Sequence, residues 1–118
     1  LFAIGQATAD IRAARDTLLA NVDRMWDRVD AGKEVTFEQR AEGRQTQVQA
    51  AWRAVNAIDQ VYPRCGGNAL RMDKPLQRFW RDAHAGQHHA IHVPSTVFHA
   101  ASLSRLGADP QGPLRAMI

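Results

Sequence analysis

The N-terminal segment carries the feature that most constrains this chain, a long and unbroken helical spacing of apolar residues. They recur at steps of three and four, at Ile4, Ala7, Ile11, Ala14, Leu18, Val22, Met25 and Val29. Because a helix completes a turn in about 3.6 residues, this spacing gathers them on one face. Gly32 follows, in the place where a left-handed residue commonly ends a helix. The pattern therefore predicts one long helix over residues 4–29.

A second long helix is predicted from Thr36 to about Val61. Thr36 followed by Gln39 has the spacing of a capping box, in which each side chain bonds to the backbone of the other residue. The helical stripe continues through Ala41, Val48, Ala51, Trp52, Val55 and Ile58. Pro63 prevents much extension. Two long helices joined by a short turn near residues 30–35 are expected to pack antiparallel.

Two shorter helices complete the predicted fold. Pro75 stands at the first position of a third helix, which Pro94 interrupts. Ser95 or Thr96 is expected to cap a fourth helix that Gly107 closes, with breaks near residues 62–74 and 93–96. The tail over residues 108–118, with two prolines and a glycine, is expected to be irregular. No segment alternates like a strand, so residues 1–118 are predicted to form one all-α domain, an antiparallel four-helix bundle.

Composition and charge bear on partners and location. The sequence is 45% hydrophobic and 23% charged, and no apolar run approaches the roughly 20 residues of a membrane-spanning helix. Its start shows no signal peptide, and Cys65 is the single cysteine, which indicates a reducing cytoplasm. The net charge is +3, yet arginine and aspartate are interleaved along the first helix, as on a solvated helix face. We expect neither a membrane nor a nucleic-acid partner.

Four histidines lie close together near the predicted end of the third helix, at His84, His88, His89 and His92. Two pairs, His84/His88 and His88/His92, have the spacing of a helical metal site, but no glutamate or cysteine lies near to complete a ligand set. We therefore expect no metal. Histidine also donates or accepts protons near neutral pH, which makes this cluster the candidate for chemistry.

Helical geometry separates these histidines. If the helix continues through His89, that residue shares an edge with Arg78 and Asp82, and the small Ala85 leaves room beside it. His84 and His88 then lie about 100–160° away and are expected to face solvent. Arg78 and Asp82 also have a purely structural interpretation. One turn apart on a helix, they could form a surface ion pair worth a few tenths of a kcal/mol. Trp26, Trp52 and Trp80 are expected to pack in the core.

A family resemblance is carried by Gly66-Gly67 and by the run from Pro75 to Ala83. It resembles the C-terminal signature of acyl-CoA dehydrogenases, in which a glycine pair precedes a proline-led helix containing Arg-x-x-Arg-Asp. The resemblance implies the C-terminal helical domain of a larger flavoenzyme, with an N-terminal helical domain and a middle β-domain outside this chain. It implies flavin contacts for Gly66, Gly67, Arg78 and Asp82, and a tetramer with these helices at its centre.

The chain departs from the dehydrogenases after Ala83. They typically continue with Ile-x-x-x-x-Glu-Gly-Thr, whereas residues 84–92 here are rich in histidine. This continuation resembles the oxygenase components of two-component flavin-dependent monooxygenases. The resemblance implies hydroxylation of a phenolic or other aromatic substrate with O2 and reduced flavin, FMN or FAD, supplied by a separate flavin reductase. The family's catalytic histidine falls eight residues after the second arginine of the motif, which is His89.

Two other functions stay open at this point. The chain could belong to an acyl-CoA dehydrogenase-like flavoprotein that oxidises acyl thioesters, or it could be a non-enzymatic helical module for oligomerisation. The monooxygenase and both of these alternatives agree with one property of the predicted helices, their small buried apolar area. The long helices carry narrow stripes that contain alanine, so they bury limited apolar area and are expected to associate with further partners.

Overall fold

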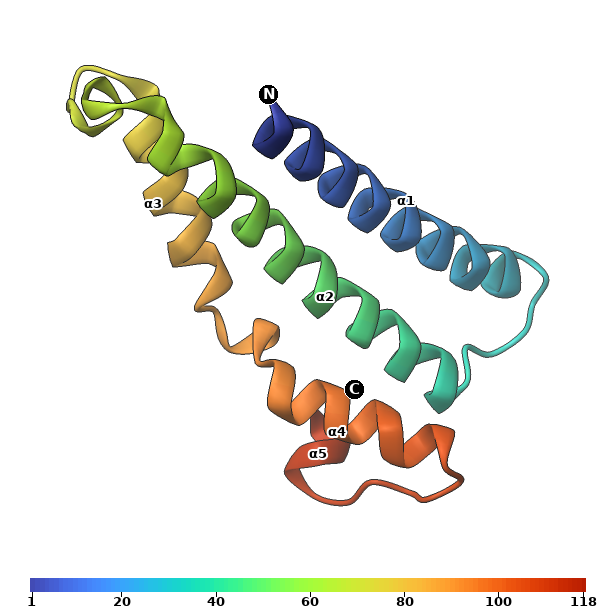
Figure 1. The fold of residues 1–118 in the computed structure, drawn as a ribbon. Coiled ribbons are helices and arrows are strands. Elements are labelled where there is room, and N and C mark those ends of the chain that lie inside the picture. Colours follow the sequence, from blue (N-terminus) through green and yellow to red (C-terminus); the bar gives the residue numbers. More distant parts are fainter.

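The computed structural model describes every residue from 1 to 118 and is entirely helical. Its helices are α1 (Phe2–Asp30), α2 (Phe37–Val61), α3 (Pro75–Gln87), α4 (Pro94–Arg105) and α5 (Pro113–Ala116), and its 3-10 turns are η1 (Tyr62–Cys65), η2 (Gly67–Leu70) and η3 (Ala90–His92). Helices α1 and α2 lie side by side and antiparallel, and α3 and α4 follow one another along the other side of α2 (Figure 1). The predicted all-α antiparallel bundle is confirmed, with α2 at its middle.

The ends of the two long helices are those that the sequence predicts. Gly32 has a positive φ of 69°, and its N–H and that of Lys33 bond to the carbonyls of Val29 and Arg28. The capping box is present at the start of α2, where the N–H of Gln39 donates to Thr36 Oγ1 at 3.2 Å and the N–H of Thr36 donates to Gln39 Oε1 at 2.9 Å. Local capping therefore sets the turn that brings the helices together.

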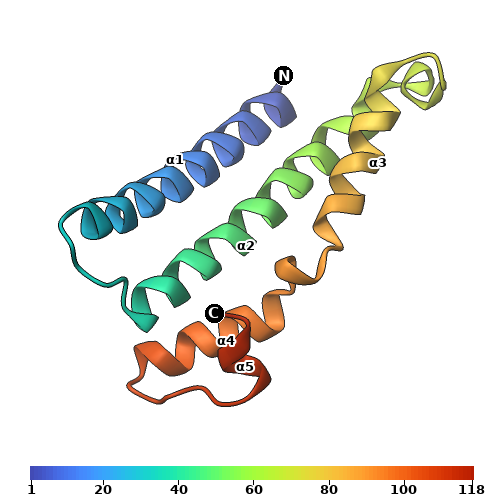
Figure 2. The same ribbon diagram turned by 180° about the vertical axis from the view of Figure 1, so that it is seen from behind.

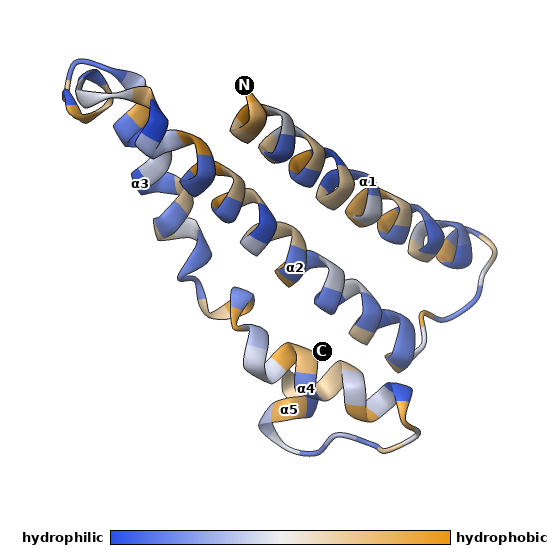
Figure 3. Ribbon diagram, viewed as in Figure 1, coloured by the Kyte–Doolittle hydropathy of each residue, from blue (hydrophilic) through white to orange (hydrophobic).

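The core consists of small side chains on either side of α2. Its buried apolar members are Ala3, Ala7, Ala14, Ala41, Val48, Val55, Ala57, Ala69, Val97, Ala100 and Ala101. Small residues let helices approach closely but remove little apolar area from water. Many large apolar side chains stay exposed as a result, and Figure 3 shows that apolar positions recur along the whole of α1. None of the helices combines the length and apolar character needed to cross a lipid bilayer.

The tryptophans correct one prediction. Trp26 is 70% exposed and Trp52 is 39% exposed, so neither is a core residue, and only Trp80 is half-buried. The physical reason is that α1 has a neighbour on one side only, which leaves Trp26 uncovered. Trp52 turns its indole N–H toward the backbone of His92, at 2.9 Å.

The third helix is shorter than predicted. It ends at Gln87 rather than at Pro94, so the break lies at residues 88–93. Side chains compete for the carbonyls of its last turn, because Nδ1 of His88 donates to the carbonyl of His84 at 2.7 Å and Nδ1 of His92 donates to that of Gly86 at 3.0 Å. Helix α4 then begins directly at Pro94, with Val93 as its N-cap in place of Ser95 or Thr96.

The C-terminal tail is also more ordered than predicted. It forms the short helix α5, which lies against α4, as the view from behind shows (Figure 2). The guanidinium carbon of Arg115 lies 4.6 Å from the ring centroid of Phe37, at the start of α2. Arg115 also pairs with Asp109. These two contacts fold the tail back onto the bundle.

Candidate active site

The base of the site is a polar cluster that joins α3 to α2. Asp59 on α2 accepts two hydrogen bonds from α3, one from Trp80 Nε1 at 2.8 Å and one from His84 Nε2 at 3.2 Å. The Trp80 ring stacks on Tyr62, with centroids 5.6 Å apart, and lies 4.1 Å from the imidazole of His84. This cluster fixes α3 against α2 and sets where the segment after α3 begins.

His84 corrects the prediction that it faces solvent, because only 23% of its side chain is exposed. Its Nδ1 lies 2.8 Å from the carbonyl of Trp80, and its Nε2 faces the carboxylate of Asp59. Both ring nitrogens are thus engaged within the chain, one by the backbone of its own helix and one by a side chain of α2. His84 is therefore a structural residue of the helix pair.

His89 does not share a helix edge with Arg78 and Asp82, because α3 ends before it. Its backbone is extended, with φ −63° and ψ 140°, and it caps the turn η3. The N–H of Ile91 donates to Nδ1 of His89 at 3.2 Å. The structure thus places the predicted catalytic histidine on an exposed turn that follows α3, separate from the ion pair on the helix.

The hydrogen bond at Nδ1 distinguishes His89 from its neighbours. Because a backbone N–H only donates, Nδ1 of His89 accepts, and its neutral ring therefore carries the proton on Nε2. In His88 and His92 Nδ1 donates to a carbonyl instead, so the neutral rings have no proton on Nε2. His89 is the member of the cluster that offers a neutral N–H donor to a molecule outside the chain.

Two residues of α2 to which the sequence analysis gave no role in the site hold this turn. Arg44 Nη2 donates to the carbonyl of Ile91 at 2.8 Å, and Trp52 Nε1 donates to that of His92 at 2.9 Å. They lie 47 and 40 positions earlier in the chain. No local spacing could pair them with the turn, since the contacts depend on how α2 and η3 meet.

Gly66 and Gly67 lie where η1 meets η2, in a segment called the glycine loop below. Gly66 adopts φ 73° and ψ 179°, a conformation that is nearly restricted to glycine, and Gly67 follows in the first position of η2. Both residues are exposed, and a Cβ at either would meet no atom within 4 Å. An open hollow of about 270 Å³ lies beside them. This exposed backbone fits the close approach of a large flat cofactor.

Arg78 and Asp82 form the surface ion pair that is the simpler interpretation of their spacing. Nε of Arg78 lies 3.4 Å from Oδ2 of Asp82, and their side chains are 72% and 62% exposed. Arg78, but not Asp82, borders an open hollow of about 410 Å³, together with Asp73, Lys74 and Arg81. The Arg71 guanidinium bonds to Asp73 and lowers the pKa of that carboxyl. Both groups of the ion pair are thus free to contact an external partner, and their flavin role stays a prediction.

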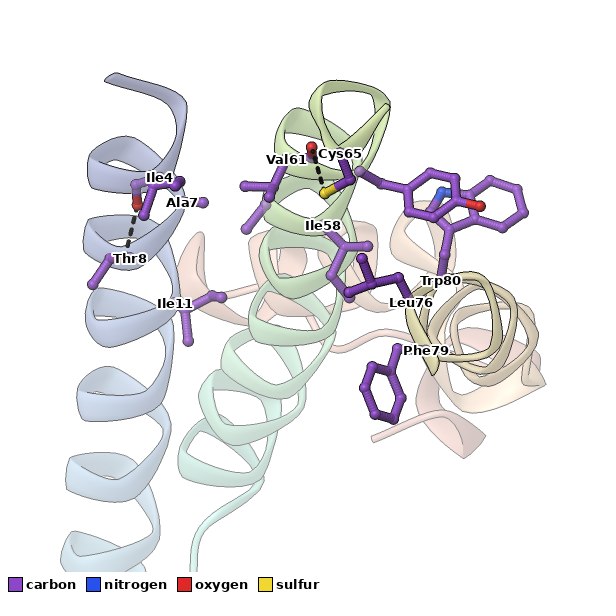
Figure 4. A pocket seen from close by; sticks show the side chains of 12 residues that line it. Ile4, Ala7, Thr8, Ile11, Ile58, Val61, Cys65, Leu76, Phe79 and Trp80 are labelled. Atoms are coloured by element: carbon purple, nitrogen blue, oxygen red, sulfur yellow. Dashed lines mark hydrogen bonds between the residues drawn. The ribbon is translucent and has the colours of Figure 1, made fainter. Parts of the chain in front are cut away.

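An apolar cavity of about 440 Å³ opens between α1, α2, η1 and α3 (Figure 4). Its polar wall groups are occupied within the chain, since Thr8 bonds to the carbonyl of Ile4 at 2.7 Å and the thiol of Cys65 to that of Val61 at 3.5 Å. The cavity therefore presents apolar surface rather than reacting groups. Nowhere do three histidine, cysteine, aspartate or glutamate side chains gather so as to hold a metal ion.

Comparisons with known proteins place this chain in a family. The family described as "Acyl-CoA dehydrogenase, C-terminal domain" matches residues 1–94. A protein of Rhodococcus erythropolis named pigment production hydroxylase is 98% identical over all 118 residues. The oxygenase subunit HsaA of a flavin-dependent monooxygenase from Mycobacterium tuberculosis is 40% identical over 107 residues, or 91% of this chain.

Solved structures agree in fold. The crystal structure of the HsaA monooxygenase from M. tuberculosis superposes with a TM-score of 0.89 and 38% identity, over 97% of this chain and 30% of that one. The present chain spans only 30% of the length of the R. erythropolis hydroxylase and 27% of that of the M. tuberculosis subunit.

Proposed function

This chain belongs to the acyl-CoA dehydrogenase C-terminal domain family, and we propose that it forms the C-terminal part of the oxygenase component of a flavin-dependent monooxygenase. The names of its relatives support this proposal, because they are a hydroxylase and a monooxygenase oxygenase subunit. The remaining length of those relatives leaves room for an N-terminal helical domain and a middle β-domain. We further propose a cytoplasmic tetramer that receives its flavin from a separate reductase.

The proposed reaction hydroxylates a phenolic or other aromatic substrate. One atom of O2 enters the ring as hydroxyl and the other leaves as water. Reduced flavin, as FMN or FAD, supplies the two electrons when it is bound. In this chain Gly66 and Gly67 would hold the cofactor through their exposed backbone, and Arg78 and Asp82 would contact it through the exposed charged side chains of their ion pair.

The observation that carries the proposal is the hydrogen bond from the Ile91 N–H to Nδ1 of His89, which leaves Nε2 to hold the proton of the neutral ring. A neutral imidazole with its proton on Nε2 donates a hydrogen bond to an oxygen atom, whereas its other nitrogen is already occupied by the Ile91 N–H. Of the two roles compatible with a histidine here, this tautomer favours a donor toward oxygen over a base that removes the proton of a phenol. His89 would hold that proton in position during oxygen transfer.

The test uses the full-length protein, chemically reduced flavin, a phenol and ¹⁸O2. The proposal predicts one ¹⁸O atom in the hydroxylated product, no product without reduced flavin, and no reduction of an artificial dye with acyl-CoA substrates. Dye reduction with an acyl-CoA and no phenol product would identify a thioester-oxidising enzyme instead. A protein that changes neither substrate would be the non-enzymatic helical module.

A further inference from the structure

We propose that Arg44 and Trp52 are positioning residues for His89, acting through the backbone of the turn that follows α3. The inference rests on the proposed function, because it assigns the support of the catalytic residue named there. It concerns two side chains of α2 that lie outside the family signature and touch neither the glycine loop nor the ion pair on α3.

Arg44 reaches His89 through one residue. Its Nη2 donates to the carbonyl of Ile91 at 2.8 Å, and the N–H of that same Ile91 donates to Nδ1 of His89 at 3.2 Å. The backbone of Ile91 is thus held at both of its polar groups. A shift of this residue would move the donor that orients the imidazole and selects its tautomer.

Trp52 reaches His89 by a parallel route. Its Nε1 donates to the carbonyl of His92 at 2.9 Å, and the N–H of His92 donates to the carbonyl of His89 at 2.8 Å. One route therefore ends on the ring of His89 and the other on its backbone. Together they tie the exposed turn η3, which lies beyond the end of α3, to the central helix α2.

The environment of Arg44 fits a positioning role. Its Nε donates to the carbonyl of Met117 at 3.0 Å, and its Nη1 donates to the side chain of Gln47. The half-buried guanidinium is held by three neutral acceptors, and no carboxylate forms an ion pair with it. This use of the planar fork requires arginine, because the ammonium of lysine is a single point on a flexible chain.

The experiment compares matched variants of the full-length enzyme. Arg44→Lys keeps the charge but loses the fork, and Trp52→Phe keeps a ring but loses the N–H. Arg53→Lys is the arginine control on the same helix, and Trp26→Phe is the control for an exposed tryptophan without a bonded N–H. We expect kcat for hydroxylation to fall about tenfold in the first two variants, as for a misplaced catalytic group, with KM changed less than about twofold. Both controls should behave like the wild type.

A double-variant measurement separates positioning from general structural damage. If Arg44 acts through His89, Arg44→Lys should lower hydroxylation no further in a His89→Ala background, because the group it positions is gone. Additive losses in that background would overturn the proposal. A wild-type kcat in Trp52→Phe would also overturn it, and this variant decides the matter if Arg44→Lys fails to fold. Absence of hydroxylation by the wild type would refute the proposed function instead.

Discussion

The backbone N–H of Ile91 lies 3.2 Å from Nδ1 of His89, and no hydrogen bond within the chain engages the other ring nitrogen of that histidine. Three of the four clustered histidines use Nδ1 to cap carbonyls of α3, at Trp80, His84 and Gly86. These bonds help to end the helix. His89 is thereby placed on an exposed turn, with Nε2 in no hydrogen bond within the chain.

The glycine loop gives a prediction for stability. Gly66→Ala should lower the free energy of unfolding by about 1–3 kcal/mol, because alanine is strained at φ 73° and ψ 179°. Gly67→Ala is the matched control, since Gly67 has no positive φ and equal open space. Urea unfolding of the full-length protein measures both. Equal midpoints for the two variants would show that the loop does not hold the conformation described.

The cluster at Asp59 gives a prediction for coupling between helices. A double-mutant cycle of Asp59→Ala and His84→Ala should show a coupling free energy of about 0.5–1 kcal/mol, because the pair is partly shielded from water. The exposed pair of Arg24 and Glu42, with side chains 59% and 49% accessible, should show less. Urea titrations of the four variants of each cycle provide the values. A coupling at Asp59–His84 no larger than that of the exposed pair would argue against a structural role for His84.

The exposed apolar side chains lead to a prediction about assembly. Phe2, Val29 and Phe79 are 84%, 57% and 59% exposed, and such surfaces commonly mark contacts with other chains or domains. We predict a tetramer for the full-length protein, the assembly implied by the family resemblance. Multi-angle light scattering at micromolar concentration measures its mass. A monomer would contradict the prediction.

The long helices were predictable because their determinants are local. The apolar spacing of α1, the positive φ at Gly32 and the Thr36–Gln39 capping box all act within a few residues. The end of α3 was not predictable from periodicity, which gives no weight to histidine side chains that compete for backbone carbonyls. The prediction for His89 came from the motif, whereas the helix edge used to support it does not exist.

The support of the candidate site lay beyond the reach of sequence spacing. The sequence pattern gives no role to Arg44 and predicts a core position for Trp52, and only the packing of α2 against η3 shows their partners. His84 was assigned to solvent by the helical wheel. It is instead half-buried against Trp80, because the carboxylate of Asp59 on another helix lies 3.2 Å from its Nε2.

The central claim is that Nε2 of His89 donates to an oxygen atom in the reaction, and His89→Asn tests it most directly. Asparagine keeps an acceptor for the Ile91 N–H, so the turn should persist, but it removes Nε2. The measurement is hydroxylated product formed per O2 consumed by the full-length enzyme, with His88→Asn as control. We predict that hydroxylation falls on the order of a hundredfold in His89→Asn, with O2 diverted to hydrogen peroxide, while His88→Asn stays near wild type. Equal, near wild-type ratios in both variants would contradict the claim.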